Sequence, residues 1–359
     1  MPLFNWFHIG SNYLFSKNPL YLIFQITSRC NSRCLTCFNW KILDEEKGRN
    51  DLSLDEIEKI SENYGPLLQL TIGGGEPFLR DDIDEICFLF SKNNSVQHIT
   101  IPTNALLPEK VAEKIESILK KCHLNYLRLG ISLDAIGERH DRIRGVVGNY
   151  EKAKETYRHL LPLKEKYENF GIEVSSVFSA LNKEIMKETI DIVKEEFTEI
   201  DKHAVVVVRG DARNPETKEI TADEYADVIG YLYKREEAEK RKSRFIPDFF
   251  KTIFKINTDI VYKNLKGEKW PIRCLAGKRL IIIKSDGEVL PCEILDEVLG
   301  NLRDNDYQMD RILNTDKAKR VIKKIKETQC SCTFECAVHA SLIFNFNNYP
   351  HIFKEMLKQ

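Results

Sequence analysis

Three cysteines within eight residues form the first group that could do chemistry. Cys30, Cys34 and Cys37 stand in "CNSRCLTC" with C-x3-C-x2-C spacing, and the loop holds no histidine. A structural zinc site needs four ligands, commonly arranged as two separated pairs. A 4Fe-4S cluster is normally held by four thiolates, so three thiolates leave one iron open to another ligand. The loop therefore predicts a cluster with one open iron.

A second set of five cysteines lies toward the C-terminus. It comprises Cys274, Cys292, Cys330, Cys332 and Cys336, the last three within "CSCTFEC". Such a set suits either an iron-sulfur cluster or a structural zinc ion that staples a small domain. Cys87 and Cys122 stand alone in helical patterns, and each is interpreted as a small buried hydrophobe.

Composition limits the classes of protein to which the chain can belong. Its 359 residues, 42% of them apolar, are enough for one large domain and a smaller one. A formal net charge of -1 provides no positive field for binding DNA or bulk RNA, so no nucleic-acid partner is expected. No secretory signal pattern opens the chain. The ten cysteines therefore indicate metal-directed thiols in a reducing cytoplasm.

Both ends of the chain are rich in aromatic residues. The first 24 residues are too interrupted to span a bilayer, and "HASLIFNFNNYPHIF" near the C-terminus has the same character. We interpret both as amphipathic segments that close the main domain. The alternative is contact with a membrane surface, which would make the cytoplasmic protein membrane-associated.

The remaining pattern predicts an α/β protein in two parts. Six β-rich runs alternate with amphipathic helical stretches over residues 20–218, which is typical of a partial (β/α)6 TIM-like barrel. A helical linker is expected over residues 219–270, and an apolar segment over residues 1–19. A small α+β cluster-binding domain follows over residues 271–359, with a β-hairpin turning at Asp286-Gly287.

Further motifs follow successive predicted strands, at the barrel end where active sites are built. They are "GGGEP", "PTNA" and "ISLDA" with the following "ERHDRIRG". Together with the cysteine loop after the first strand, they resemble the radical S-adenosylmethionine (SAM) superfamily. The resemblance implies that Cys30, Cys34 and Cys37 hold a SAM-binding 4Fe-4S cluster. It also implies that SAM is bound by Gly74, Gly75, Glu76, Thr103, Asn104, Ser132, Asp134 and Arg144.

Specific roles come with this resemblance. The glycines would let the backbone approach the ligand, and Glu76 would accept from the SAM ammonium group. Ser132 and Arg144 would hold the SAM carboxylate. The chain departs from the family at Thr36, where an aromatic residue is common, and Phe38 is the nearest substitute.

The second cysteine set resembles the SPASM or twitch domains that follow many radical SAM barrels. The spacing C-x12-G-x4-C, from Cys274 through Gly287 to Cys292, carries this resemblance. It implies one auxiliary 4Fe-4S cluster on Cys274, Cys292 and Cys336, with Cys330 and Cys332 competing for the fourth place. A structural zinc ion stays as the alternative.

The activity implied is reductive cleavage of SAM to a 5'-deoxyadenosyl radical that abstracts hydrogen from an unidentified substrate. The auxiliary cluster would accept or relay an electron, and flavodoxin or ferredoxin would donate one. The substrate could be a small molecule, a lipid-linked molecule or a peptide, the last making the chain a ribosomal-peptide maturase. The alternative of another class is a non-catalytic, metal-stapled binding protein. Arg209, after the sixth strand, is interpreted as a surface salt-bridge residue, or as a contact for an anionic group.

Overall fold

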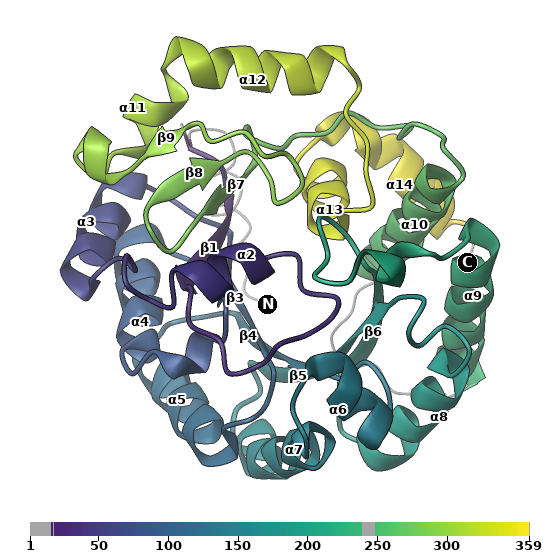
Figure 1. Ribbon diagram of the computed structural model, residues 1–359. Helices are drawn as coiled ribbons and strands as arrows, with labels where there is room; N and C mark the ends of the chain where they lie inside the picture. Colours follow the sequence, from purple (N-terminus) through teal and green to yellow (C-terminus); the bar gives the residue numbers. More distant parts are fainter. Residues whose placement is uncertain (1–15, 17, 239–247, 359) are drawn as a thin grey trace.

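Nine strands form one sheet in the order β6-β5-β4-β3-β2-β1-β7-β8-β9 (Figure 1). The computed structural model describes residues 16, 18–238 and 248–358. Strands β1 to β6 and β7 pair in parallel, whereas β8 and β9 are antiparallel additions. The strands are β1 Tyr21–Thr27, β2 Gln69–Gly74, β3 His98–Thr103, β4 Tyr126–Ser132, β5 Phe170–Phe178, β6 Lys202–Val207, β7 Leu280–Ile283, β8 Glu288–Leu290 and β9 Gly300–Asn301.

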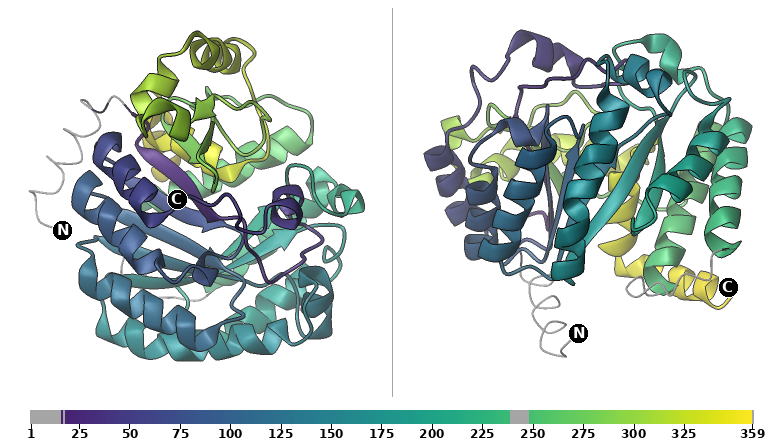
Figure 2. Two further views of the ribbon diagram at one scale, coloured as in Figure 1. Left: turned by 60° about the vertical axis from the view of Figure 1, so that its left-hand side comes forward. Right: turned by 90° about the horizontal axis from the view of Figure 1, so that it is seen from below.

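Helices surround the outside of the curved sheet (Figures 1 and 2). Those of the barrel are α2 Trp40–Glu45, α3 Leu54–Tyr64, α4 Ile83–Asn94, α5 Pro108–Lys121, α6 Glu138–Arg144, α7 Asn149–Lys166, α8 Met186–Glu196, α9 Ala222–Ala238 and α10 Asp248–Leu265. The C-terminal ones are α11 Met309–Leu313, α12 Asp316–Glu327, α13 Glu335–Ile343 and α14 Tyr349–Met356. Short 3-10 turns lie at Pro77–Leu79, Pro215–Lys218, Arg303–Asn305 and Phe346–Asn348. The predicted α/β fold with a partial barrel is confirmed.

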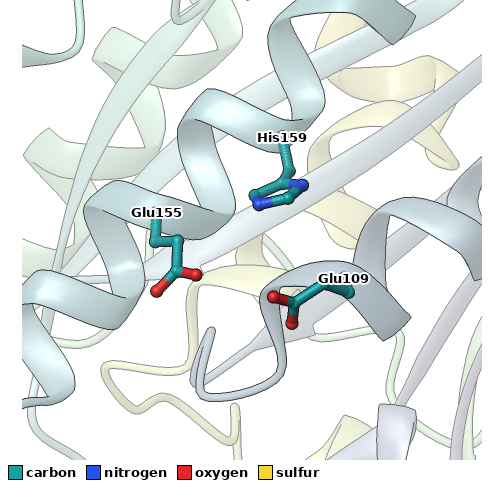
Figure 3. A group of neighbouring side chains, drawn as sticks. All are labelled: Glu109, Glu155 and His159. Carbon is teal, nitrogen blue, oxygen red and sulfur yellow. The ribbon is translucent and has the colours of Figure 1, made fainter.

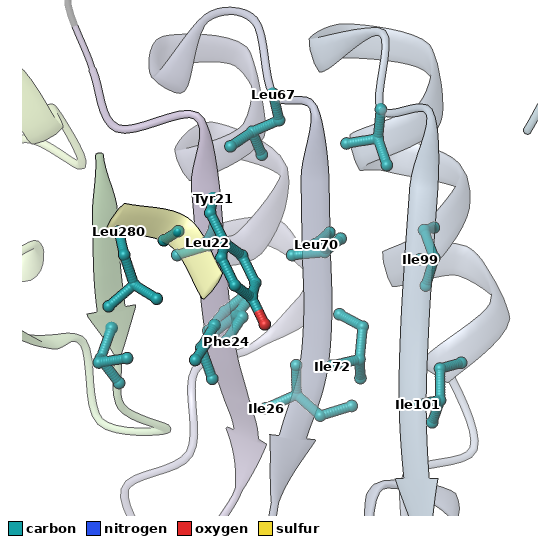
Figure 4. Packing of buried hydrophobic residues seen from close by; sticks show 14 of the residues in the cluster. Tyr21, Leu22, Phe24, Ile26, Leu67, Leu70, Ile72, Ile99, Ile101 and Leu280 are labelled. Carbon is teal, nitrogen blue, oxygen red and sulfur yellow. The ribbon is translucent and has the colours of Figure 1, made fainter. Parts of the chain in front are cut away.

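Side chains along the strands alternate between the helix-covered outer face of the sheet and the inside of the barrel. Side chains such as Leu22, Phe24, Ile72 and Ile101 point outward and are fully buried against the helices (Figure 4). Residues at the intervening positions face the inside of the barrel, and many of them are polar. Because successive side chains of a strand point to opposite faces, burying one set fixes the other set inside.

The first long helix illustrates how local sequence sets an element's position. Ser53 caps α3 by accepting from the Glu56 backbone at 3.3 Å, and Glu56 accepts from the Ser53 backbone at 2.9 Å. This is the capping box that the sequence predicts. It fixes the start of α3 three residues after Asp51, whose carboxylate accepts hydrogen bonds from Thr27 and Ser28 at the end of β1.

The C-terminal hairpin extends the barrel sheet. Strand β7 pairs in parallel with β1, with Tyr21 opposite Leu280, and β8 turns back through Gly287 at a φ of 88°. The predicted hairpin at Asp286-Gly287 is therefore confirmed, and its strands continue the main sheet instead of forming a separate one. The domain boundaries at residues 20, 219 and 271 stay predictions.

Helix α13 lies at the open side of the barrel between β6 and β1. Its first residue, Glu335, accepts from the Val207 backbone of β6 at 3.3 Å, and the next residue, Cys336, interacts with Tyr21 of β1. Helix α13 also packs against α10. The aromatic C-terminal segment thus supplies part of the wall that six strands alone leave open.

Residues 1–15 and 17 of the predicted apolar segment lie outside the described residues, as do residues 239–247 of the predicted helical linker. In the part of the chain that the structure describes, no helix is long and apolar enough to cross a membrane.

Candidate active site

The Cys30–Cys37 loop follows β1 at the carboxyl ends of the strands, where neighbouring segments hold its backbone. Arg33 and Leu35 donate to the carbonyls of Arg144 and Ile143 at 3.1 and 2.9 Å. Asn104 donates to Asn31 at 2.7 Å and to Ser32 at 3.0 Å. On the other side, Arg213 and Asn214 donate to the carbonyls of Cys37 and Leu35 at 3.0 and 2.9 Å. The loop is therefore fixed from several strand ends.

Gly74, the last residue of β2, and the following Gly75 pack directly against the end of β1, where this loop begins. A Cβ atom on Gly75 would lie 2.0 Å from the Arg29 carbonyl oxygen, and one on Gly74, whose φ is 126°, 2.3 Å from the Thr27 oxygen. The Gly75 amide donates to Thr27 at 2.8 Å. These glycines allow close approach of the segment that leads into the cysteine loop, and the approach of a ligand to them stays a prediction.

The carboxylate of Glu76 joins the ends of β2 and β3. This carboxylate accepts from the Thr103 hydroxyl at 2.9 Å and from the Asn104 backbone amide at 2.7 Å. Glu76 is only 2% exposed. Burial outweighs these bonds and raises the pKa of Glu76 to about 7. Both oxygens already have donors, so the observed role of Glu76 is to position Thr103 and Asn104. Its contact with the SAM ammonium group stays a prediction.

Arg144 ends α6 beside the cysteine loop. Its guanidinium donates to Asp134 at 3.2 Å, and Asp134 also accepts from the Val177 amide at 2.8 Å. The Nε atom of Arg144 is buried without a hydrogen-bond partner among the described residues. The guanidinium lies close enough to Cys30 and Cys34 for electrostatic interaction. This buried cation with a free donor suits an anionic ligand at the thiols.

Two more predicted residues differ in exposure. Asp134 is 0% exposed and bonded within the fold, so it anchors Arg144. Ser132 ends β4 opposite Ser175 of β5, and its side chain is half-buried. Of this pair, Ser132 is the residue accessible to a ligand.

In the part of the chain that the structure describes, the thiols are not gathered as closely as the ligands of a bound zinc ion. Four thiolates bound tetrahedrally to zinc at 2.3 Å lie about 3.8 Å apart. Among the described residues, no three cysteine sulfurs lie within 4.8 Å of one another. Burial raises the pKa of Cys30 to about 11 and that of Cys37 to about 12. These buried thiols need a positively charged partner to hold them as thiolates, which a cluster of iron supplies.

The five C-terminal cysteines divide into a group and a separate member. Cys274 interacts electrostatically with Cys292, Cys330 and Cys332. Cys336 instead faces the Tyr21 hydroxyl, with Arg209 and Glu293 as its main charged neighbours. The sequence interpretation grouped Cys336 with Cys274 and Cys292, whereas this arrangement favours Cys330 and Cys332 together. The ligand set therefore stays a proposal.

Arg209 is a residue whose burial the sequence does not predict. It forms an ion pair with Glu293 at 2.9 Å, with side chains only 19% and 8% exposed. The expected salt bridge is therefore present, but its expected place at the surface is wrong because both side chains are largely buried. The available signal was the position of Arg209 directly after the buried run "VVVV", at the barrel mouth.

Two remaining features lie apart from this site. Cys87 and Cys122 are buried in the core, as predicted. Glu109, Glu155 and His159 bring their ligand atoms within 4.8 Å of one another in the outer helical layer (Figure 3). Glu155 is already paired with Lys152 at 2.6 Å, and Glu109 and His159 are exposed.

Two known families match the chain, and each match covers one of the two cysteine sets. Residues 24–164 match the radical SAM superfamily, and residues 274–337 match the iron-sulfur cluster-binding domain called SPASM. The chain is a radical SAM enzyme with a SPASM-type domain. It uses SAM, the cluster that binds SAM and an auxiliary iron-sulfur cluster, so the predicted family and cofactors are confirmed.

Relatives span most of the chain at low identity. An AdoMet-dependent heme synthase of Methanosarcina barkeri is 24% identical over 301 residues, which is 81% of each chain. A GTP 3',8-cyclase of Clostridium botulinum is 26% identical over 321 residues, covering 86% of this chain and 88% of that one.

Solved structures show the same fold. The structure of anSMEcpe with bound AdoMet is 19% identical, with a TM-score of 0.61 over 95% of this chain and 96% of that one. Streptococcus suis SuiB bound to the precursor peptide SuiA is also 19% identical, with a TM-score of 0.59 over 88% of this chain and 70% of that one.

Proposed function

We propose that Cys30, Cys34 and Cys37 hold the SAM-binding cluster and that Arg144 and Ser132 orient SAM beside it. The observation that carries this assignment is the buried Arg144 guanidinium, which lies beside Cys30 and Cys34 with an unpaired Nε atom. When bound, the cluster and SAM supply a 5'-deoxyadenosyl radical that removes a hydrogen atom from the substrate.

The chain's own contribution is to orient these groups and to exclude water. Asp134 fixes the direction of the Arg144 guanidinium, and Asn104 fixes the loop at Asn31 and Ser32. Both Asp134 and Asn104 are at most 5% exposed, so their rotamers are held by packing. Rigid positioning of this kind places reacting atoms without further loss of entropy at the reaction step.

We propose that Cys274, Cys292, Cys330 and Cys332 hold one auxiliary cluster. Their mutual electrostatic neighbourhood supports this set, and Cys336 is left facing Tyr21. Four thiolates fully ligate a 4Fe-4S cluster, so this cluster would exchange electrons without binding substrate directly.

The inner face of the barrel supports a polar substrate in preference to a lipid chain. Arg128 of β4 and Glu173 of β5 form an ion pair at 3.4 Å. Thr71 and Thr100 stand in the same row as Arg128, and Ser132 pairs with Ser175 nearer the mouth. Such groups would lose their hydrogen bonds against an apolar chain, at a cost in free energy.

Iron counting tests the cofactor assignment. The reconstituted protein should bind about eight irons per chain, four for each 4Fe-4S cluster. A variant lacking Cys30, Cys34 and Cys37 should keep about four and form no 5'-deoxyadenosine with dithionite and SAM. Zinc near one per chain in that variant, without cluster absorbance, would make the second set a structural staple. Failure of the intact protein to cleave SAM would instead indicate the non-catalytic alternative.

Fractionated cell extract tests the substrate class. Polar metabolites, lipids and peptides are added separately to the reduced enzyme with SAM, and the release of 5'-deoxyadenosine is measured. The polar fraction should raise the rate above that without substrate. A rise with the lipid fraction alone would contradict this proposal and leave the cofactor assignment intact, whereas a rise with the peptide fraction would make the polar substrate a peptide.

A further inference from the structure

The side chain of Arg209 contacts residues that adjoin each of the two cysteine sets in the sequence. Its guanidinium carbon is 5.0 Å from the ring centre of Phe38, which directly follows the first set. The same carbon is 4.9 Å from the ring centre of Phe334, which lies within the second set. A terminal nitrogen donates to Glu293 at 2.9 Å, one residue after Cys292. Each partner of Arg209 is thus one or two residues from a predicted cluster ligand.

The segment around Arg209 is itself bound to the first set. Arg213 donates its amide to the Cys37 carbonyl at 3.0 Å. Gly210 has a φ of 66°, and a Cβ atom there would lie 3.0 Å from the Cβ atom of Phe38. The backbone around Arg209 is therefore held against the Cys30–Cys37 loop, while the Arg209 side chain extends to Phe334 and Glu293 in the C-terminal region.

Stability alone is a poor reason for this arrangement. The side chains of Arg209 and Glu293 are 19% and 8% exposed, so both charges have lost most of their hydration. A buried ion pair often contributes no more stability than apolar residues of similar size. What a guanidinium adds is a fixed positive charge and flat faces that stack on aromatic rings. Both properties are useful between two redox groups.

We propose that Arg209 is a positioning residue that holds the two cluster loops in register and favours the reduced state of the auxiliary cluster. This inference rests on the proposed function. Arg209 is a charged neighbour of Cys332, and its partner Glu293 directly follows Cys292, so it lies beside two of the proposed auxiliary ligands. Adding one electron makes the cluster more negative by one charge, and a nearby cation stabilises that form. The reduction potential of the auxiliary cluster should therefore depend on the charges of Arg209 and Glu293.

The test is an EPR-monitored redox titration of the cluster-loaded enzyme. Arg209→Met should shift the one-electron reduction equilibrium of the auxiliary cluster toward the oxidised form about tenfold, or about 59 mV. Glu293→Gln should shift it in the opposite direction, and the double variant should return toward the parent value. Arg209→Lys should stay close to the parent. Arg213→Met, whose neighbours are Asp44 and first-set cysteines, serves as the control and should leave the auxiliary signal unchanged.

The possible results distinguish a failure of the role proposed for Arg209 from a failure of the proposed auxiliary cluster. Equal potentials in Arg209→Met, Glu293→Gln and the parent, with all clusters loaded, would overturn the role of charge. Shifts of the same sign in both single variants would also overturn it, because a loosened structure does not distinguish the two charges. If the parent protein loads no auxiliary cluster, the proposed function fails first.

Discussion

Arg303 contacts both carboxylate oxygens of Glu56, at 2.7 and 3.0 Å, and so ties the start of α3 to the 3-10 turn that follows β9. Tyr307 donates to the same carboxylate at 3.1 Å. The Arg303 hydrogen bonds are the main reason that the pKa of Glu56 falls from 4.5 to about 2. The barrel and the cluster-binding region are therefore joined by a charged contact outside the active site.

This contact predicts an acid-sensitive part of the stability. Because the folded-state pKa of Glu56 is depressed, its contribution is fully present above about pH 4.5 and is lost as pH falls through about 2. Arg303→Met should lower the free energy of unfolding by about 1–2 kcal/mol near pH 7 and flatten its fall toward acid. Urea unfolding of the metal-free protein at several pH values measures both. Lys323→Met, which breaks an exposed pair at 3.6 Å, is the control and should change little.

Gly75 and Gly73 allow a test of whether close packing at Gly75 is needed to hold the cysteine loop. Gly75→Ala places a Cβ atom 2.0 Å from the Arg29 oxygen, so the cysteine loop must shift. The variant should lose about half of its iron, the share of the SAM-binding cluster. Gly73→Ala meets no atom within 4 Å and should keep its iron. Equal iron in both variants, measured after reconstitution, would contradict the packing role.

Arg144 and Arg142 lie two residues apart on α6 but in different surroundings. Arg144 is 8% exposed beside the cysteine loop, whereas Arg142 is exposed. Arg144→Ala should weaken SAM binding at least tenfold, since a charge-assisted hydrogen bond contributes about 1.5–3 kcal/mol. Arg142→Ala should bind SAM normally. Calorimetry on the cluster-loaded proteins decides, and unchanged affinity in Arg144→Ala would remove it from the SAM site.

The surroundings of Cys336 predict that it is not an auxiliary ligand. Cys336→Ser should retain about eight irons per chain, whereas Cys332→Ser should lose part of the auxiliary cluster. Iron analysis and cluster absorbance distinguish the two. Loss of iron in Cys336→Ser with full loading in Cys332→Ser would restore the sequence-based assignment.

Patterns within single elements were readable from the sequence. The six strands, the Ser53–Glu56 capping box and the hairpin at Asp286-Gly287 all depend on neighbouring residues, and all are observed. Contacts between distant segments were not readable. The pairing of Tyr21 with Leu280, and of Arg209 with Glu293, depends on tertiary packing that no local pattern encodes.

The candidate site shows the same division. The motifs identified which strand ends meet, because parallel strands place their carboxyl ends together. They did not show that Gly75 packs on Arg29 or that the Glu76 carboxylate accepts hydrogen bonds from Thr103 and Asn104. A sequence motif gives residue types, whereas the direction of each side chain depends on its buried partners.

The pairing of β1 with β7 has a consequence for how the chain matures. One edge of β1 finds its partner only when residues 280–283 have been synthesised, some 250 residues later. Until then a buried-type, apolar strand edge is left open, and such edges promote aggregation. Shortening the chain before β7 would leave that edge permanently unpaired. The two cluster-binding regions are therefore poor candidates for exchange as independent modules, and metal loading of both should follow completion of the whole chain.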